Sequence, residues 1–474
     1  MSQTTPAPPG GLPDEQTGAA SEPAADVHHT GCCIVGGGPA GLVLALLLAR
    51  RGVPVTVLEA HADFDRQFRG DTVHPGILEM LDQIGLAEPL HRLPHVKLFG
   101  PSLVTRQGLL PLMDFRRLKA RFPYIMLLPQ ERFLEFLSAE AAKYPHFRLV
   151  MRARVQQLIE EGGTVRGVRY RAAGGGWQEV RAPLTVGADG RFSRVRQLAG
   201  IKATVVSDPM ELLWFRLPRL PGDASELDAA DAVLRGKPFA VVGGEGGTAA
   251  VFLHRGEGFL FAVMNRVDHW QVAYIYRPGS YAELKAAGVE AFRSSIAELE
   301  PRLEPHLETL TDWRRLSPLS VAFSRCRRWF RPGLLLIGDA AHVMTPAAGA
   351  GIKYAIEDAV EAANVLGGPL LSGRVGVSDL ARVQRRREWP IRFMQGAAAF
   401  QQRTVLSRAL RHSPPTRPGR LPLLMRVLLR VPVLRDLPAR FVAFGFWRVR
   451  IEDTSDVGRR PGAEPDAIGA ATTG

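Results

Sequence analysis

The sequence predicts an α/β protein that combines a Rossmann-like dinucleotide-binding domain, an interleaved β-sheet domain and a C-terminal helical region. Three observations predict this class. An apolar strand, a glycine-rich turn and a helix follow one another from Cys32 to Arg51, as in a βαβ unit. Strand-like segments fill residues 201–325, and a basic, Leu-rich stretch lies between Arg382 and Arg450.

The length of 474 residues, well above the common domain size, predicts more than one domain. The expected boundaries are a disordered tail at 1–29, a discontinuous dinucleotide-binding domain at 30–100, 126–200 and 326–375, a β-layer at 101–125 and 201–325, a C-terminal basic helical region at 376–450, and a flexible tail at 451–474.

Composition is that of a globular protein, with 46% hydrophobic and 23% charged residues. The three cysteines, Cys32, Cys33 and Cys326, have no spacing typical of a disulfide framework or a metal knuckle, so we expect no metal site and a cytoplasmic location. The apolar run Leu42–Ala49 is far shorter than the roughly 20 residues that cross a bilayer. No transmembrane segment and no nucleic-acid partner are expected.

The formal net charge of +13 gathers near the C-terminus, where residues 382–450 hold 16 Arg, no Lys and two acids. This region could lie on an acidic membrane surface as a peripheral contact. It could instead cap the rest of the protein with its apolar faces inward and its Arg side chains outward. We favour the capping interpretation, because amphipathic helices more often bury their apolar face against protein.

The first motif is a G-x-G-x-x-G run formed by Gly36, Gly38 and Gly41 at the end of a predicted strand. Gly36 permits the turn, Gly38 lets the backbone approach a pyrophosphate, and Gly41 allows close packing of the helix. Glu59, which ends the second strand, is placed to accept from ribose hydroxyls and disfavours a 2′-phosphate. The motif alone does not separate FAD from NAD. The other positions expected beside the cofactor are Pro39, Ala40 and Ala60.

Two later runs complete the pattern. One is VGADGRFSRVR at Val186–Arg196, which contains Asp189, and the other is LLLIGDAAHVMTPAAGAGIKYAIEDA at Leu334–Ala359. In the second run Gly338 and Asp339 follow an apolar strand, and small residues lead into an amphipathic helix expected to end near Asn364. The amino end of that helix favours negative charge in the space after the strand.

These three motifs, in this order, resemble the single-component aromatic hydroxylases, the group A flavoprotein monooxygenases that are similar to para-hydroxybenzoate hydroxylase. The resemblance covers about residues 31–400. It implies that FAD is the bound cofactor, that NADPH or NADH is the transient reductant, and that a flavin hydroperoxide formed with dioxygen hydroxylates an aromatic or phenolic small molecule. The chain is thus predicted to be an FAD-dependent NAD(P)H monooxygenase, an oxidoreductase.

The resemblance also implies roles for individual residues. Arg69, Pro346 and Lys353 are the candidate catalytic residues. In addition to the first motif, the residues expected to contact FAD are Arg69, Gln130, Asp189, Gly338, Asp339, Pro346, Gly349, Gly351 and Ile352. His342 is expected to be a structural hydrogen-bonding partner and not an acid or base.

Lys353 departs from the family pattern, because many relatives carry Asn at this place, in the first turn of the helix beside the flavin. A cation there is unfavourable unless an anion lies close by, and reduced flavin could be that anion. The alternative, which the flexibility of Lys favours, is that its stem packs while its ammonium reaches solvent.

The β-layer is expected to cover one face of the flavin and to bind the substrate. Its candidate lining residues are Trp214, Arg216, Arg266, His269 and Tyr274. Because successive side chains of a strand point to opposite faces, about half of any such set faces away from the site.

Two other functions stay open at this point. A flavin-dependent reductase or dehydrogenase of an isoprenoid or quinone would share the first and third motifs and could use the basic region at a membrane. A non-catalytic flavin-binding regulator would retain the same glycines and Asp339. The sequence does not separate a monomer from a homodimer.

Overall fold

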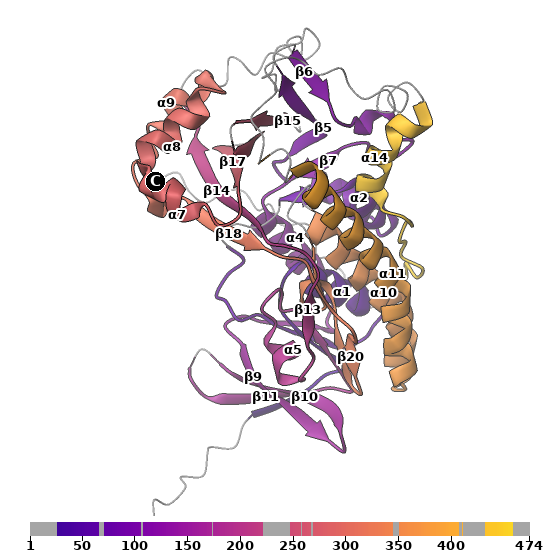
Figure 1. Cartoon of the computed structure of the whole chain (residues 1–474). Coiled ribbons are helices and arrows are strands. Elements are labelled where there is room, and N and C mark those ends of the chain that lie inside the picture. The colour runs from indigo at the N-terminus through magenta and orange to yellow at the C-terminus, as the bar shows by residue number, and fades with distance from the viewer. Residues whose placement is uncertain are drawn as a thin grey trace, which may run out of the picture.

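The computed structural model describes residues 26–65, 71–105, 108–172, 174–220, 247–256, 258–266, 269–344, 350–406, 410 and 432–457. Two large sheets dominate, each with helices on at least one face (Figure 1). The first is a six-stranded sheet at the centre of the main hydrophobic core, and the second belongs to the β-layer that the sequence predicts.

The six-stranded sheet has the strand order β20-β21-β12-β2-β3-β8 and is parallel except for its edge strand β20. Its central strands are buried in every residue, as expected of a parallel sheet covered on both faces. The strands are β2 (Cys32–Val35), β3 (Val55–Leu58), β8 (Phe147–Val150), β12 (Leu184–Gly187), β20 (Phe330–Arg331) and β21 (Leu334–Leu336).

Helices α1 and α10 pack against each other over this sheet, α4 packs on α1, and α11 packs on α10 (Figure 1). Their bounds are α1 (Pro39–Arg50), α4 (Gln130–Ala142), α10 (Ala350–Leu371) and α11 (Val377–Gln401). The predicted end of α10 near Asn364 is wrong. The helix continues for two more turns because Val365, Leu366 and Leu370 still reach the core.

A four-stranded sheet, β1-β11-β10-β9, lies at the far end of the molecule from the large sheet of the β-layer (Figure 1). Its strands are β1 (Asp26–His29), β9 (Arg154–Glu161), β10 (Thr164–Arg171) and β11 (Trp177–Arg181). The prediction of a disordered tail at 1–29 is therefore wrong for its last four residues. They form β1, which pairs in parallel with β11 and supplies backbone partners to an edge strand more than 140 residues away.

The large sheet of the β-layer has the order β18-β14-β17-β16-β15-β5-β7-β4, and β6 pairs with β5. Its strands are β4 (Thr72–Val73), β5 (Val96–Thr105), β6 (Gly108–Pro111), β7 (Ile125–Leu127), β14 (Met210–Pro218), β15 (Gly247–Arg255), β16 (Phe259–Asn265), β17 (His269–Tyr276) and β18 (Ser317–Val321). The predicted boundaries at 100/101 and 125/126 are wrong in detail. They cut through β5 and β7, which pair with each other in this sheet.

One face of this sheet carries its own core, in which Phe215 of β14 and Tyr274 of β17 pack on Phe292 of α8. The covering helices are α7 (Tyr281–Ala286), α8 (Gly288–Ala297) and α9 (Glu304–Leu307), with 3₁₀ turns η3 (Pro301–Leu303) and η4 (Trp313–Arg315) (Figure 1). A small sheet of β13 (Ala203–Val205), β19 (Ser324–Cys326) and β22 (His342–Val343) joins the two large sheets. The predicted boundary at 325/326 falls inside β19.

The remaining elements are α2 (Pro75–Gln83), α3 (Ala87–His91), α5 (Arg194–Leu198), α14 (Pro432–Phe444), the 3₁₀ turns η1 (Phe115–Arg117) and η5 (Gly338–Ala340), and the π-helical turn η7 (Gln402–Leu406). Ala439, Ala443 and Phe444 of α14 are buried against β5, β7 and Phe115. This part of the basic region therefore caps the protein, as the capping interpretation predicts.

The beginning of the predicted flexible tail also packs on the protein. Ile451 is buried, and the Val457 backbone N–H donates to the carbonyl oxygen of Arg50 at 2.8 Å. Arg51 pairs with Asp453 at 3.3 Å. The prediction of a flexible tail from residue 451 is thus wrong for 451–457, because two Arg side chains at the end of α1 bind this segment. In the described part of the chain, helices fall short of the length and apolar character needed to span a membrane.

Candidate cofactor and substrate site

The glycine-rich turn between β2 and α1 is fixed by close backbone contacts. Gly36 has a φ of +109°, and a Cβ there would lie 2.4 Å from the carbonyl oxygen of Ala188. A Cβ on Gly41 would lie 2.0 Å from the carbonyl oxygen of Gly36. Gly38 differs, because no atom lies within 4 Å of the place its Cβ would take. The turn is therefore tight within the protein and open beside Gly38, at the amino end of α1, where Pro39 and Ala40 begin the helix.

Glu59 braces this turn from the end of β3. Its Oε2 accepts from the backbone N–H of Gly37 at 2.8 Å, and its Oε1 accepts from the backbone N–H of His61 at 3.0 Å. The sequence predicts only the ribose contact and misses this bracing role. Nδ1 of His61 lies 2.6 Å from the same Oε1, so both oxygens of this carboxylate already have partners within the protein. Ala60, next to it, is exposed.

Asp189 in the second motif holds its own loop. It accepts from the Ser193 hydroxyl at 2.5 Å and from the Val195 backbone N–H at 3.0 Å. Burial raises the pKa of Asp189, and these hydrogen bonds only partly offset that. Arg196 of the same motif donates to the carbonyl oxygen of Ala340 at 2.9 Å. The second and third motifs are thus in direct contact.

The third motif turns sharply after β21. Gly338 has a φ of +59°, and a Cβ there would lie 3.1 Å from Cβ of Ala355 in α10. Asp339 follows and is half-buried, and so are Gly351 and Ile352 in the first turn of α10. The space beside Gly351 is open. Pro346 and Gly349 of this motif, and Arg69, lie outside the described residues.

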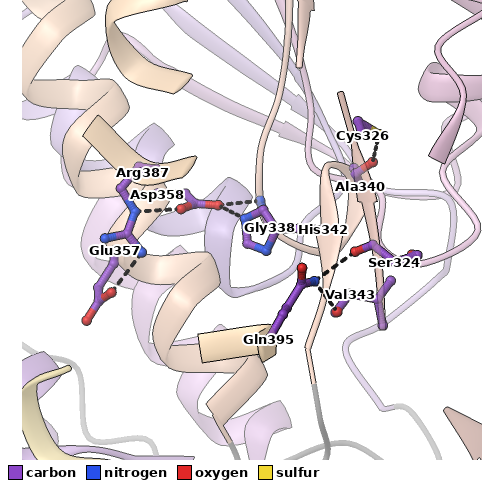
Figure 2. A network of polar contacts seen from close by, with 10 residues as sticks. All are labelled: Ser324, Cys326, Gly338, Ala340, His342, Val343, Glu357, Asp358, Arg387 and Gln395. Carbon is purple, nitrogen blue, oxygen red and sulfur yellow. Dashed lines mark hydrogen bonds and ion pairs between the residues drawn. The ribbon is translucent and has the colours of Figure 1, made fainter. Parts of the chain in front are cut away.

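A buried carboxylate that the sequence does not predict holds this turn (Figure 2). Asp358 of α10 is fully buried and accepts from the backbone N–H of Gly338 at 2.9 Å. His342 Nε2 lies 2.6 Å from the same oxygen, which confirms His342 as a structural partner. Arg387 of α11 donates to the other oxygen at 2.7 Å and to Glu357 at 2.8 Å. Burial would raise the pKa of Asp358, but His342 and Arg387 outweigh it and hold the pKa below its ordinary value.

Lys353 belongs to the same charged cluster. Its side chain is only 2% exposed, so the interpretation that its ammonium reaches solvent is wrong. Its Nζ lies 3.5 Å from Glu357 and over the ring of Tyr354. Burial lowers the pKa of Lys353, and the Glu357 carboxylate opposes that shift. Lys353 therefore already has an anionic partner within the protein.

A cavity of about 290 Å³ lies between the amino end of α4 and the large sheet of the β-layer. Gln130 lines it together with Arg216, Arg266 and His269, so three of the five substrate candidates share one cavity with a cofactor candidate. Asp71, which the sequence analysis misses, lines it as well. Arg69, two residues earlier, is a candidate from the sequence, but nothing in the local sequence indicates that the partner of Asp71 is Arg266.

Arg266 and Asp71 form a buried ion pair in this cavity, with 3.2 Å between Nη2 and Oδ2. Burial raises the pKa of Asp71 despite the nearby Arg266, and burial lowers the pKa of Arg266 despite Asp71. The Nε and Nη1 atoms of Arg266 are buried and have no hydrogen-bond partner among the described residues. These two nitrogen atoms together carry three N–H donors that no described residue uses.

The other two substrate candidates do not line this cavity. Tyr274 lies on the opposite face of the sheet, where it is 2% exposed and its ring is 4.9 Å from that of Phe292. The prediction for Tyr274 is therefore wrong. Trp214 shares the face of Arg216 but packs, half-buried, beside Leu212 and Ala273. Alternation along β17 places Tyr274 and His269 on opposite faces, as expected for a strand, whereas Trp214 is kept out of the cavity by its own packing.

Comparison with known proteins identifies the family. A sequence model described as an FAD binding domain matches residues 29–388, which is more than half of the chain. The chain belongs to this FAD-binding family. The 6-methylpretetramide 4-monooxygenase of Streptomyces rimosus is 34% identical over 436 residues, which cover 90% of this chain and 96% of that protein.

Two further relatives agree. The para-nitrophenol 4-monooxygenase of Pseudomonas sp. (strain WBC-3) is 27% identical, over 71% of this chain and 77% of that protein. The structure of OxyS anhydrotetracycline hydroxylase from Streptomyces rimosus superposes with a TM-score of 0.61 at 24% identity, covering 88% of this chain and 76% of that one. That likeness supports the fold. The two sequence relatives are monooxygenases, which confirms the prediction of an FAD-dependent monooxygenase and disfavours the reductase alternative.

The geometry of this FAD-dependent monooxygenase fits its cofactor. The amino ends of α1 and α10 each carry a glycine with open space beside it, Gly38 and Gly351. Helix amino ends favour negative charge, such as that of a pyrophosphate or of a reduced flavin ring. Asp339 follows directly on Gly338, whose backbone is held by Asp358. The site thus has open space at two helix amino ends, and it has a carboxylate, Asp339, next to a turn that Asp358 holds in place.

Proposed function

We propose that this monooxygenase hydroxylates a phenol or a similar electron-rich aromatic molecule, which binds in the cavity beside Gln130, Arg216, Arg266 and His269. NADPH or NADH is the reductant and dioxygen the oxidant. The observation that carries the proposal is the convergence of these four side chains on one cavity of about 290 Å³. That volume is at the small end of the range typical of small-molecule sites. The names of the two monooxygenase relatives support the substrate class.

We assign FAD to the three motifs. Gly36, Gly38 and Gly41, with Pro39 and Ala40, form the turn for its pyrophosphate, and Glu59 meets a ribose. Asp339 accepts from the ribityl chain, and Gln130 lies where the cavity meets the cofactor. When bound, FAD supplies the hydride acceptance and oxygen activation that protein side chains lack. Asp189 supports this arrangement through its loop, and Gly351 and Ile352 stand at the second helix end.

The protein's own residues bind and orient the substrate and limit the access of water. The Nε and Nη1 donors of Arg266, which have no partner among the described residues, suit the oxygen of a phenol or phenolate. Asp71 holds the guanidinium in place through Nη2. Arg216 and His269 line the same cavity and offer a positive charge and a hydrogen-bonding imidazole. An aromatic ring with an oxygen substituent is the substrate that these groups recognise.

The test is a screen of phenols, aromatic acids and quinones for stimulation of FAD reduction by NADPH or NADH under nitrogen, followed by mixing with oxygen. We expect a phenol to speed flavin bleaching and to be hydroxylated after oxygen is added. Anaerobic consumption of NADPH with stoichiometric reduction of a quinone would instead support the reductase alternative. A bound flavin that no compound and no nucleotide reduces would support the non-catalytic regulator.

We also propose that the enzyme is cytoplasmic and is a monomer or homodimer. The three cysteines are free and buried, which is compatible with a reducing compartment. A peripheral contact of the basic region with an acidic membrane stays a prediction. The packing of α14 on β5 and β7 supports the capping interpretation for the described part of that region.

A further inference from the structure

The buried charged cluster between α10 and α11 has no place in the substrate cavity. It consists of His342, Lys353, Glu357, Asp358 and Arg387, each with a side chain at most 5% exposed. Buried charges are costly unless each has a partner with good geometry. We therefore expect this cluster to hold a specific part of the fold in place.

One oxygen atom of this cluster fixes both ends of a turn. Asp358 Oδ2 is 2.9 Å from the backbone N of Gly338 and 2.6 Å from Nε2 of His342. Asp339, which we assign to the cofactor, lies between these two residues in the sequence. Two hydrogen bonds to a single acceptor leave the turn little freedom. A shift of Asp358 would move both of its ends.

The second oxygen of Asp358 ties this turn to the C-terminal helix. Arg387 of α11 donates through Nε to Asp358 at 2.7 Å and through Nη2 to Glu357 at 2.8 Å. The planar guanidinium suits two carboxylates on neighbouring residues of one helix. Lys353 then pairs with the free side of Glu357 at 3.5 Å. Part of the charge that compensates the buried Asp358 thus comes from α11, through Arg387, and the rest comes from His342.

We propose that Asp358 is a positioning residue for FAD, and that Arg387 makes cofactor binding depend on the docking of α11. The carboxylate holds Gly338 and His342, and through them sets the place of Asp339. This inference rests on the proposed contact between Asp339 and FAD. Neither Asp358 nor Arg387 touches the cofactor in this account. Both act through the turn.

The test compares FAD dissociation constants of apoprotein variants, measured by fluorescence titration. Asp358→Asn keeps the shape of the side chain but removes its charge and one acceptor, and we expect FAD affinity to fall at least tenfold. Glu357→Gln is the matched control, because it also touches Arg387 but makes no bond to the turn. We expect its FAD affinity to stay within threefold of the wild type. Equal losses in both variants, or a folded Asp358→Asn with unchanged affinity, would overturn the proposal.

A double-mutant cycle keeps the proposal testable if Asp358→Asn does not fold. Arg387→Lys retains the charge but loses the two-pronged geometry, and we expect it to weaken FAD binding about fivefold in the wild-type background. In the Asp339→Asn background the same change should have almost no further effect, because both act through one side chain. A purely structural role for Arg387 would give additive losses, and additivity would refute the coupling.

The same cycle separates this inference from the cofactor assignment. If Asp339→Asn alone binds FAD like the wild type, the assignment of Asp339 is wrong. If Asp339→Asn loses FAD affinity but Asp358→Asn does not, the assignment of Asp339 stands and the positioning role of Asp358 is wrong. Far-ultraviolet circular dichroism of each apoprotein confirms that the comparison is between folded proteins.

Discussion

At the scale of single residues, Arg266 is the side chain on which the proposed substrate site depends most. Its Nη2 is held by Asp71, and its two other nitrogen atoms lack partners among the described residues. A hydrogen bond to a charged group contributes about 1.5 to 3 kcal/mol. We therefore expect Arg266→Lys to lower kcat/KM for the phenolic substrate by about 10- to 100-fold, as measured by steady-state oxygen uptake.

Tyr274→Phe is the control for that experiment. It removes a hydroxyl on the opposite face of the same sheet, where burial raises the pKa of Tyr274 to about 12. We expect kcat/KM within about twofold of the wild type. Successive side chains of a strand point to opposite faces of the sheet, which keeps the Tyr274 hydroxyl away from the cavity. A loss as large as that of Arg266→Lys would show that the assignment of the two faces is mistaken.

His254 predicts a pH dependence of stability. Its ring stacks on Phe261 and is 2% exposed, and burial together with nearby Arg302 lowers the pKa of His254 to about 4. The unfolded chain, with a pKa near 6.5, binds this proton more readily than the folded one. Stability should therefore fall as the pH drops from about 6.5 to 4, by up to about 3 kcal/mol.

Urea unfolding at pH 7 and pH 5 measures this effect. We expect the difference in unfolding free energy between the two pH values to shrink in His254→Gln, which does not titrate. Carboxylates contribute to acid destabilisation as well, so the informative quantity is the difference between wild type and variant. An identical pH dependence in both proteins would exclude His254 as its source.

At the scale of elements, substitutions in the turn between β2 and α1 should distinguish effects on folding from effects on cofactor binding. Gly38→Ala places its Cβ in open space at an ordinary φ of −80°, so the apoprotein should unfold like the wild type. FAD binding should weaken at least tenfold, because that space is assigned to the pyrophosphate. Gly41→Ala should instead destabilise the apoprotein, since its Cβ would lie 2.0 Å from a backbone oxygen. Thermal unfolding with and without FAD measures both effects, and unchanged FAD binding by Gly38→Ala would contradict the assignment.

In helix α10, the pairing of Lys353 with Glu357 changes what we expect of a substitution there. If reduced flavin were the anionic partner of Lys353, Lys353→Asn would make the flavin harder to reduce, because the ammonium would balance the reduced ring. The structure places Glu357 3.5 Å from that ammonium, so we now expect the FAD midpoint potential to stay close to that of the wild type. Potentiometric titration decides between the two, and a clearly lower potential in the variant would restore the counter-ion hypothesis.

The elements that the sequence predicts well are those set by local pattern. The strand, turn and helix around Gly36 and Gly41, and the strand before Gly338, follow from apolar runs and glycine spacing. The bonds from Asp358 to Gly338 and Arg387 could not be predicted, because they join residues 20 and 29 positions apart across three elements. Helical periodicity places Asp358 on a buried face but does not name its partners.

At the scale of the whole molecule, the sequence predicts an α/β fold with a dinucleotide-binding sheet and a second, interleaved sheet, and the structure has both sheets. The boundaries between the units could not be read from composition, since β5 pairs with β15, more than 100 residues later in the chain, and β7 joins the same sheet by pairing with β5. The same holds for β1 and for the segment 451–457, each of which gains its structure from a distant partner. Long-range pairing depends on the complete sheet and leaves little trace in local sequence.

The cavity between these units is where the central claim can be tested. The most direct measurement is the incorporation of oxygen-18 into the product of a phenolic substrate, with NADPH and labelled dioxygen. The account predicts one labelled oxygen atom in each hydroxylated product molecule and one molecule of NADPH consumed for each product in the fully coupled reaction. Product that carries no label, or that forms equally well without oxygen, would contradict it.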